Sequence, residues 1–291
     1  MYNLEHLRML VWSTEEGSFS ACARKLGKAQ SAVSQGISNL EIDIGIQLFD
    51  RTTRKPTLTE DGKRIYAYAK SVLALTGELD SVVKAIQNEE EPNLRLAFDN
   101  ALFTNKLSSI LGAFSRQFPK TQIELLSVPC TDIAELVVNR QADIGIMFTT
   151  PPLIQELEYC YIGSQPFCAV CHPESALLLN EKVSISQLVN HRQLYLRGIS
   201  GDGLMHLPKI SPDIWYCNGF DITVKLVEEN LGWAFLPLHM ANKAITNGNL
   251  ATFNFELDDK PWMMPVDLVT HKGIKKGVAF QWLFEELKSL V

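Results

Sequence analysis

EGSFSACARKLGKAQSAVSQGISNLEIDIGIQLFDRTTRKPTLTEDGKRI, residues 16–65, sets the architecture of the first part of the chain. Within this stretch apolar residues recur at spacings of three and four, which predicts short amphipathic helices rather than strands. Gly27 interrupts the pattern and predicts a turn, while Ser18 or Ser20 can cap the helix that precedes this turn. The stretch therefore predicts a helix-turn-helix.

The second helix of this motif, Ala29 to Leu40, has an apolar face and a polar face. The apolar positions predicted to face the core are Ala32, Val33, Ile37 and Leu40. Glutamine can pair with adenine and serine can contact bases or phosphates, so the polar face suits a major groove. The residues predicted to contact DNA from this face are Gln30, Ser31, Ser34, Gln35 and Ser38. Spacing alone equally allows a structural helical hairpin with a solvated polar face.

A heptad repeat follows, from Thr59 to about Asn88. Its apolar positions recur at alternating spacings of three and four, as in the seam of a coiled coil. The seam consists of Ile65, Tyr68, Val72, Leu75, Leu79, Val82 and Ile86. A seam this narrow needs a second helix, which predicts dimerisation through these residues. Ala69 and Val83 widen the apolar face somewhat, which leaves open a helix packed on its own domain.

The run from Asn88 to Asn93 contains three glutamates and a proline and marks a domain boundary, because proline stops a preceding helix. Beyond it, strand-like and helix-like segments alternate, which predicts an α/β domain with a mostly parallel sheet and two βα halves. Ligands bind such domains at the junction of the halves, near the carboxyl ends of strands. The predicted organisation is a helix-turn-helix domain over 1–58, a linker helix over 59–88, a hinge over 89–93 and a larger α/β domain over 94–291.

The whole chain has 291 residues, 46% hydrophobic and 21% charged, which is typical of a globular protein with a small domain joined to a larger one. Its longest run without Asp, Glu, Lys or Arg has 15 residues, Tyr159 to Pro173, and contains two prolines, so no membrane span is expected. The start, Met1 to Glu5, lacks the basic region of a secretory signal. We therefore expect a cytoplasmic protein whose six cysteines are reduced.

Charge is distributed unevenly along the chain. Residues 1–65 hold nine Lys and Arg against eight Asp and Glu, whereas residues 66–291 hold 18 against 25. The basic residues of the first segment cluster as Arg24, Lys25 and Lys28, as Arg51, Arg54 and Lys55, and as Lys63 and Arg64. Phosphates bind to a local basic face, so the net charge of −6 does not exclude a nucleic-acid partner.

Residues 3–65 resemble the winged helix-turn-helix of LysR-type transcriptional regulators. The motifs that carry this resemblance are Gly17-Ser18-Phe19, Ala32-Val33-Ser34-Gln35, Leu40-Glu41, Leu48-Phe49-Asp50-Arg51 and Leu58-Thr59-Glu60-Asp61-Gly62. The resemblance continues more weakly to the C-terminus, through Phe118-Pro119, residues 142–146, His172-Pro173 and residues 232–237. It implies an α/β protein overall: an all-α winged helix-turn-helix, a long linker helix that dimerises, and a two-subdomain α/β domain of the type 2 periplasmic-binding-protein kind that senses a small molecule.

The resemblance also implies the partners and a role for the wing. Arg51, Arg54 and Lys55 would reach phosphates or the minor groove of operator DNA. Many family members carry basic residues where this chain has Gln35, Ser38 and Asn39, so more of its DNA affinity should come from the wing. The implied partners are double-stranded operator or promoter DNA, RNA polymerase, an unknown small-molecule effector and further copies of the chain, as a homodimer and then a homotetramer.

In the family the effector lies between the two halves of the C-terminal domain. In this chain the matching positions follow the first strand, open the helix after the second strand, and end a strand of the second half. They are Asn100, Ala101, Leu102, Thr104, Cys130, Thr131, Arg197, Ser200, Asn218 and Phe220. Exposed N–H groups at helix starts would favour an anionic ligand, and Arg197 could clamp a carboxylate. Thr131 as an ordinary N-cap and Arg197 as a surface cation are equally open.

Other functions remain as alternatives. Some family members sense oxidants through paired thiols, and Cys168 and Cys171 have CxxC spacing, but a strand would point them to opposite faces, which favours inert buried thiols. The sequence lacks zinc-finger spacing and the GxSxG, HExxH, GxGxxG and Walker motifs, so no metal, no cofactor and no enzymatic activity are expected. A solute-binding protein of similar shape, and an architectural DNA binder without a ligand, are further alternatives.

Overall fold

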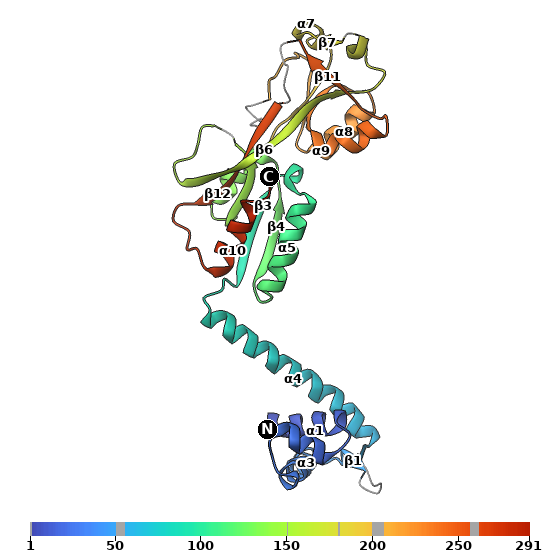
Figure 1. Cartoon of the computed structure of the whole chain (residues 1–291), viewed down its shortest axis with the longest axis vertical. Helices are drawn as coiled ribbons and strands as arrows, with labels where there is room; N and C mark the ends of the chain where they lie inside the picture. The colour runs from blue at the N-terminus through green and yellow to red at the C-terminus, as the bar shows by residue number, and fades with distance from the viewer. Residues whose placement is uncertain (1, 51–55, 150, 180, 200–206, 257–261) are drawn as a thin grey trace. The chain divides into compact units, whose positions relative to one another are not determined.

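The computed structural model describes residues 2–50, 56–149, 151–179, 181–199, 207–256 and 262–291. The chain folds as two compact units, Met1–Gln87 and Asn88–Val291 (Figure 1). The first unit contains helices α1 (Leu4–Glu15), α2 (Phe19–Leu26), α3 (Gln30–Ile44) and α4 (Glu60–Gln87), with a short hairpin of β1 (Phe49–Asp50) and β2 (Thr57–Leu58).

The predicted helix-turn-helix is confirmed in α2 and α3. The Ser18 hydroxyl accepts a hydrogen bond from the Ala21 N–H at 3.1 Å, and so caps α2. Gly27 ends α2 in the left-handed region, at φ 64°, where a residue without Cβ is favoured. The two residues that set the turn are therefore the ones that the sequence marks.

The core of the first unit is formed by apolar residues of all its helices and of the segment before the hairpin. Val33, Ile37 and Leu40 of α3 are fully buried, as predicted. Ala32 is exposed, so its predicted place in the core was wrong. Because each helical residue turns by about 100°, Ala32 lies beside the buried stripe that Val33 begins.

The start of α4 lies against the segment that precedes β1. The Thr59 hydroxyl donates to the Gln47 carbonyl at 2.8 Å and accepts from the Gly62 N–H at 2.8 Å. A Cβ on Gly62 would lie only 2.1 Å from the Leu48 carbonyl oxygen. Glycine is therefore required here by the close approach of two backbones.

Gly62→Ala is expected to lower the free energy of unfolding of the first unit by about 2 kcal/mol, because backbone atoms must separate to admit the methyl group. Gly77→Ala, in the same helix but with open space around its Cβ position, should instead raise it by about 1 kcal/mol. Urea unfolding of both variants, followed by circular dichroism, checks the pair. Equal effects of the two substitutions would contradict the proposed contact.

The second unit is built around an eight-stranded sheet, in which seven strands follow the order β4-β3-β5-β12-β6-β11-β7 and β10 pairs with β6. These strands are β3 (Asn93–Phe98), β4 (Gln122–Ser127), β5 (Ile144–Phe148), β6 (Leu157–Cys171), β7 (Lys182–Val183), β10 (Ala234–Pro237), β11 (Ala251–Phe255) and β12 (Trp262–His271). A separate parallel pair is formed by β8 (Gln193–Leu196) and β9 (Ile214–Cys217).

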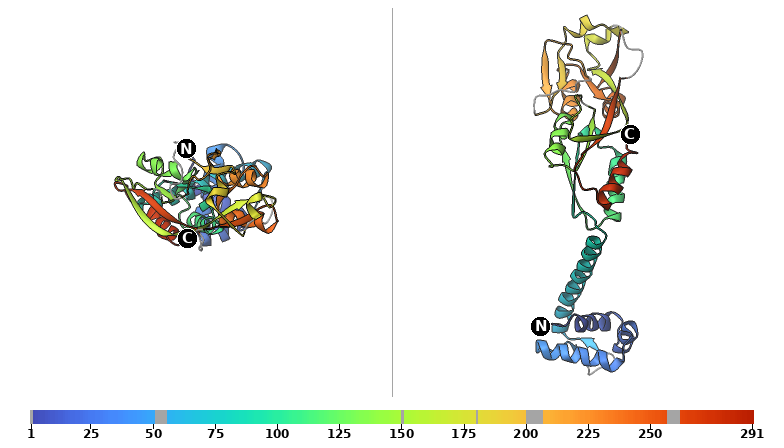
Figure 2. Two further views of the ribbon diagram at one scale, coloured as in Figure 1. Left: turned by 90° about the horizontal axis from the view of Figure 1, so that it is seen from above. Right: turned by 90° about the vertical axis from the view of Figure 1, so that its left-hand side faces the viewer.

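The helices of the second unit cover its two halves. In the first half these are α5 (Asn105–Gln117), α6 (Cys130–Val138) and α10 (Val278–Leu287), and in the second half α7 (Ile185–Leu188), α8 (Phe220–Glu228) and α9 (Leu238–Thr246). Short 3-10 helices span Asn100–Leu102 and Ala176–Leu179. In the first half α5 and α10 pack side by side (Figure 2), with the rings of Phe114 and Trp282 6.0 Å apart.

The sheet is mixed, so the prediction of a mostly parallel sheet was wrong. The β3 strand pairs in parallel with β4 and β5, but β12 pairs antiparallel with both β5 and β6, and β10 and β11 pair antiparallel with β6. Strands β6 and β12 are long and run through both halves. These two strands connect the halves. A domain built only from alternating βα units has no such connecting strands.

The expected hinge over 89–93 contains a residue fixed to the second unit. The Glu91 carboxylate accepts hydrogen bonds from the backbone N–H groups of Ala279, at 3.0 Å, and Phe280, at 3.3 Å. It thereby supplies acceptors and negative charge to the start of α10. Glu91 therefore belongs to the second unit.

Candidate DNA interface and ligand site

The polar face of α3 is accessible. Gln30, Ser31 and Gln35 are exposed, while Ser34 and Ser38 are half-buried. The amide of Gln35 donates to the Asn39 side chain at 2.8 Å, one helical turn further along. The structure thus places all five predicted residues on one helix with a polar, accessible surface.

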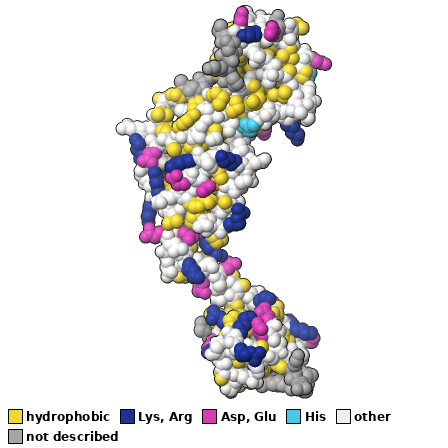
Figure 3. Space-filling view, viewed as in Figure 1, with side chains coloured by type: hydrophobic (Ala, Val, Ile, Leu, Met, Phe, Trp, Pro, Cys, Tyr) yellow, Lys and Arg dark blue, Asp and Glu magenta, His cyan; other side chains and the backbone are white. Residues whose placement is uncertain are grey.

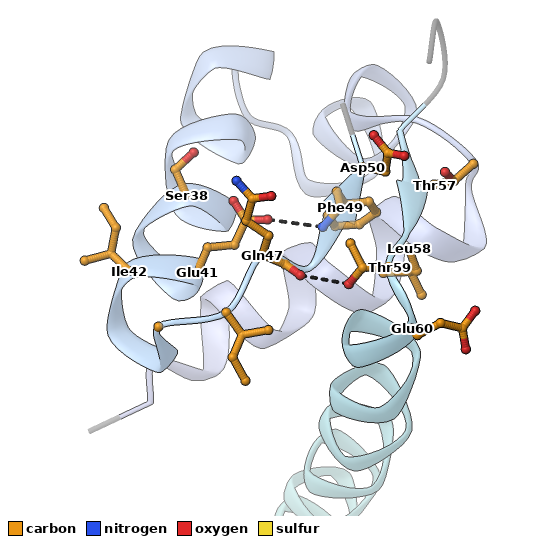
Figure 4. Close-up of a pocket in the computed structure, with 12 residues that line it drawn as sticks. Ser38, Glu41, Ile42, Gln47, Phe49, Asp50, Thr57, Leu58, Thr59 and Glu60 are labelled. Carbon is orange, nitrogen blue, oxygen red and sulfur yellow. Dashed lines mark hydrogen bonds between the residues drawn. The ribbon is translucent and has the colours of Figure 1, made fainter. Parts of the chain in front are cut away.

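Glu41, which follows Leu40 in the helix-turn-helix motif, positions the start of the wing. The Glu41 carboxylate of α3 accepts hydrogen bonds from the Leu48 N–H, at 2.8 Å, and the Phe49 N–H, at 3.1 Å (Figure 4). Two bonds to one carboxylate fix the start of β1 relative to α3. The predicted wing residues Arg51, Arg54 and Lys55 lie outside the described residues.

A hollow of about 1060 Å³ lies between the second half of α3, the hairpin and the start of α4 (Figure 4). Its lining includes three acidic residues, Glu41, Asp50 and Glu60, and the apolar Ile42 and Ile46. Carboxylates repel phosphates, so this side of α3 does not suit the DNA backbone. The residues of the first half of α3 do not line this hollow.

Basic residues near α3 are partly neutralised. Lys25 forms a 2.6 Å ion pair with Glu16, and Lys28 is paired with Glu5. On the face seen in Figure 3 basic and acidic side chains lie intermingled over the first unit. The expected basic cluster around Lys25 is therefore weaker than the sequence suggested, which increases the importance of polar contacts from α3.

An apolar stripe is exposed along α4. Tyr68 is 74% exposed, Leu75 66%, Leu79 61% and Ile86 69%. Val72 and Val82 lie on the same stripe and are each 40% exposed. Ile65 departs from the prediction, because it is half-buried against the core of its own unit. The alternative of a helix packed on its own domain thus applies to the first part of α4, where Ala69 is also buried and Leu73 packs on the core.

Four of the predicted effector residues have buried side chains. Ala101, Leu102, Cys130 and Phe220 are at most 3% exposed and belong to the core of the second unit. Apolar residues next to a ligand loop also close the core beneath it, so the expectation that these four positions contact an effector stays a prediction. Thr104 caps α5, with its hydroxyl accepting from the Leu107 N–H at 3.4 Å.

The N–H groups expected to be open at the helix starts already have acceptors. The Asp99 carboxylate accepts from the Ala101 N–H and the Cys130 N–H, both at 2.9 Å. In the same region the Asp132 carboxylate accepts from the Ile199 N–H at 3.0 Å. These acids occupy the positions where an anionic ligand was expected, so the argument for an anion at these helix starts no longer holds.

Asp99 is 2% exposed, and this burial raises its pKa to about 6. The folded unit then binds more protons than the unfolded chain between pH 4 and pH 6, so stability is lost as pH rises through this range. Relative to Asp99→Asn, the free energy of unfolding of the wild type should fall by on the order of 2 kcal/mol between pH 4.5 and pH 7. Urea titrations at several pH values measure this difference, and parallel curves for the two proteins would refute it.

Some predicted residues do meet at the junction of the two halves. The Asn100 side chain donates to the Asp221 carboxylate at the start of α8, at 3.0 Å. A Cβ on Gly198 would lie 1.9 Å from the Thr131 hydroxyl oxygen, so the loop after β8 directly approaches α6. Thr131 lies inside α6, so it does not cap that helix. Asn218 is exposed, and Ser200 lies outside the described residues.

Arg197 is exposed and lies against β9. Its guanidinium lies 4.2 Å from the ring centre of Tyr216 on β9. Sequence reasoning missed four residues near the junction: Asp99, Asp132, Asp221 and His239. Burial lowers the pKa of His239. Aspartates that open helices are common, so their sequence gave little signal of this role.

Four cysteines are buried, and Cys160 and Cys168 are half-buried. Burial raises the pKa of Cys168 and of Cys171 to about 11, and raises that of Cys130 well above its usual value. The Cys130 sulfur also accepts a hydrogen bond from the Phe148 N–H at 3.0 Å. A raised pKa lowers the thiolate fraction, so these cysteines are not activated for reaction with oxidants.

The described segments contain neither a candidate membrane span nor a candidate metal site. No helix there combines the length and apolarity needed to cross a membrane. Nor do three or more His, Cys, Asp or Glu side chains gather there as metal ligands would.

Comparisons with known proteins agree on one family. Residues 4–63 match the family described as "Bacterial regulatory helix-turn-helix protein, lysR family", and residues 87–291 match the "LysR substrate binding domain". The HTH-type transcriptional regulator AceR of Acinetobacter baumannii is 28% identical over 289 residues, which cover 99% of this chain and 97% of that protein. PtxR of Pseudomonas aeruginosa is 38% identical over 152 residues, 51% of this chain and 47% of that protein.

Solved structures share the fold. A mutant of OxyR from Corynebacterium glutamicum aligns with a TM-score of 0.58 at 22% identity, covering 99% of this chain and 92% of that one. CbnR, described as a LysR family transcriptional regulator, aligns with a TM-score of 0.58 at 16% identity, covering 98% and 100%. The family models match both the helix-turn-helix and the two-part α/β domain. The chain therefore belongs to the LysR family of transcriptional regulators.

Proposed function

We propose that this regulator recognises its operator through the first half of α3, with Gln30, Ser31, Ser34 and Gln35 reaching the base edges. The single observation that carries the proposal is the accessible polar face of α3, next to a wing that Glu41 positions. The wing cations Arg51, Arg54 and Lys55 would bind phosphates or the minor groove. Ser38 lies beside the acidic hollow and would contribute least.

The exposed stripe of α4 supports dimerisation through this helix. Six apolar side chains at heptad spacing are exposed: Tyr68, Val72, Leu75, Leu79, Val82 and Ile86. Pairing two such stripes would bury them and hold two α3 helices for two half-sites of a palindrome. A dimer of two such dimers, on an interrupted palindrome, follows from the family.

The effector is proposed to bind at the junction of the two halves of the second unit. Asn100 and Asp221 approach each other there, as do Thr131 and Gly198. A ligand that binds one arrangement of the halves better than another would shift the equilibrium between the two arrangements. This shift would change how the dimers are placed on DNA. RNA polymerase would be the partner that responds to the change. This assigns the protein a regulatory role in the cytoplasm and no enzymatic one.

A thermal-shift screen of the full-length protein against a metabolite library tests the sensor function. A ligand at 100 times its Kd should stabilise the second unit by about 2.7 kcal/mol, and the Asn100→Ala variant should lose this response. A protein that only shapes DNA would respond to no metabolite. The redox alternative predicts a response to peroxide instead, which the raised pKa values of the thiols do not favour.

A further inference from the structure

An arginine packs on each of two aromatic residues of β9, and within the described residues only one of these arginines forms an ion pair. The Arg192 guanidinium lies 4.2 Å from the ring centre of Trp215, and its Nε donates to both carboxylate oxygens of Asp213 at 3.1 Å. Arg197 lies at the same distance from Tyr216. Among the residues that the structure describes, no carboxylate forms an ion pair with Arg197. Arg192 thus has both an aromatic ring and an acidic partner, whereas Arg197 has the ring and, among the described residues, no acidic partner.

A second cation shares the Tyr216 ring. The Lys209 ammonium lies 5.6 Å from the ring centre of Tyr216 and 5.0 Å from that of Tyr195, which is the cross-strand neighbour of Tyr216. Lys209 too has no acidic partner within the described ranges. Both positive charges lie within 5.6 Å of the centre of one ring, so an anion beside that ring would be attracted by both.

Lys209 is held in position by hydrogen bonds on both sides. The Gln193 side chain of β8 donates to the Pro208 carbonyl at 2.8 Å and accepts from the Ile210 N–H at 2.8 Å. The Tyr195 hydroxyl donates to the carbonyl two residues before Lys209, at 3.0 Å. The segment is thus ordered before any ligand binds, which lowers the entropy cost of binding.

The Arg197 guanidinium packs on Tyr216 of β9, whereas the residue that follows it approaches the first half. The Cβ position of Gly198 points at Thr131 in the first half. Successive residues of an extended segment project to opposite faces, so Arg197 shares the face of Tyr195 instead. This face is separate from the contacts assigned above to the effector.

We propose that Arg197 and Lys209 form a second ligand site, which binds a small anion through a carboxylate or phosphate group. The guanidinium offers a planar pair of N–H donors to two oxygens of the anion, and the ammonium adds a positive charge beside it. The ligand supplies the negative charge that Asp213 supplies to Arg192. The site does not depend on DNA binding.

Calorimetric titration of the full-length protein with inorganic phosphate, and separately with benzoate, tests the site at constant ionic strength set with chloride. At least one probe should bind saturably, once per chain. Arg197→Gln and Lys209→Gln should each weaken that binding about tenfold or more. Arg197→Lys should recover part of the loss, because it retains the charge but not the paired donors. Lys106→Gln removes an exposed cation of α5 and is the matched control, which should leave the Kd unchanged.

The relative affinities of the two probes identify the anion class that the site prefers, and either preference supports it. The absence of saturable binding for both probes would overturn the proposal. So would an equal loss in Lys106→Gln, because it would indicate a general effect of charge. Thermal unfolding and DNA binding of the same variants show that they are folded, and a failure of DNA binding in the wild type would leave this test unaffected.

Discussion

Ser34→Glu is expected to weaken operator binding by about 100-fold or more. Ser34 is half-buried on the polar face of α3, between the exposed Ser31 and Gln35. A glutamate there adds bulk and places a negative charge next to phosphates. Fluorescence anisotropy with a labelled operator fragment measures the loss.

The matched control is Ser81→Glu, which makes the same change on the outer side of α4. Ser81 is exposed and its hydroxyl donates only to the Gly77 carbonyl of its own helix. This variant should bind the operator as the wild type does. If Ser34→Glu also bound normally, α3 would not be the recognition helix.

Leu79→Glu is expected to convert the protein to monomers. Leu79 is 61% exposed and lies in the middle of the α4 stripe. Each dimer would lose two buried leucines, which at about 2 kcal/mol each corresponds to a roughly 1000-fold weaker association before charge is considered. Light scattering coupled to size-exclusion chromatography over a range of concentrations follows the change in mass.

Ser81→Glu again provides the comparison, since it lies two residues away on the opposite side of the same helix. Its mass should equal that of the wild type. An unchanged mass for Leu79→Glu would show that the copies associate elsewhere and that the stripe has another partner.

The sequence was most informative about the first unit. Its elements are short and local, so the spacing of apolar residues and the caps at Ser18 and Gly27 could be recognised directly. The heptad positions could also be recognised from the sequence, but they differ in exposure. Ile65 packs on the core of its own unit, whereas Leu79 is exposed. Periodicity identifies the apolar face of a helix without saying what covers it.

The second unit was less predictable because its decisive contacts are remote in sequence. Strand β12 returns about 100 residues after β6 to pair with it, and its sequence contains a proline, which does not suggest a central strand. Asn100 meets Asp221, and Asp132 meets Ile199, across the junction of the halves. Effector residues such as Ala101 were predicted by position alone, and position does not distinguish a ligand contact from the core beneath it.

The most direct test of the central claim is recovery of genomic DNA fragments bound by the purified protein, performed at two salt concentrations. Sequence-specific contacts from α3 predict enrichment of fragments that share a palindromic site, which persists at the higher salt although total binding falls. Ser34→Glu should abolish the enrichment. Binding that is lost with salt and shows no shared sequence at either concentration would contradict a sequence-specific regulator.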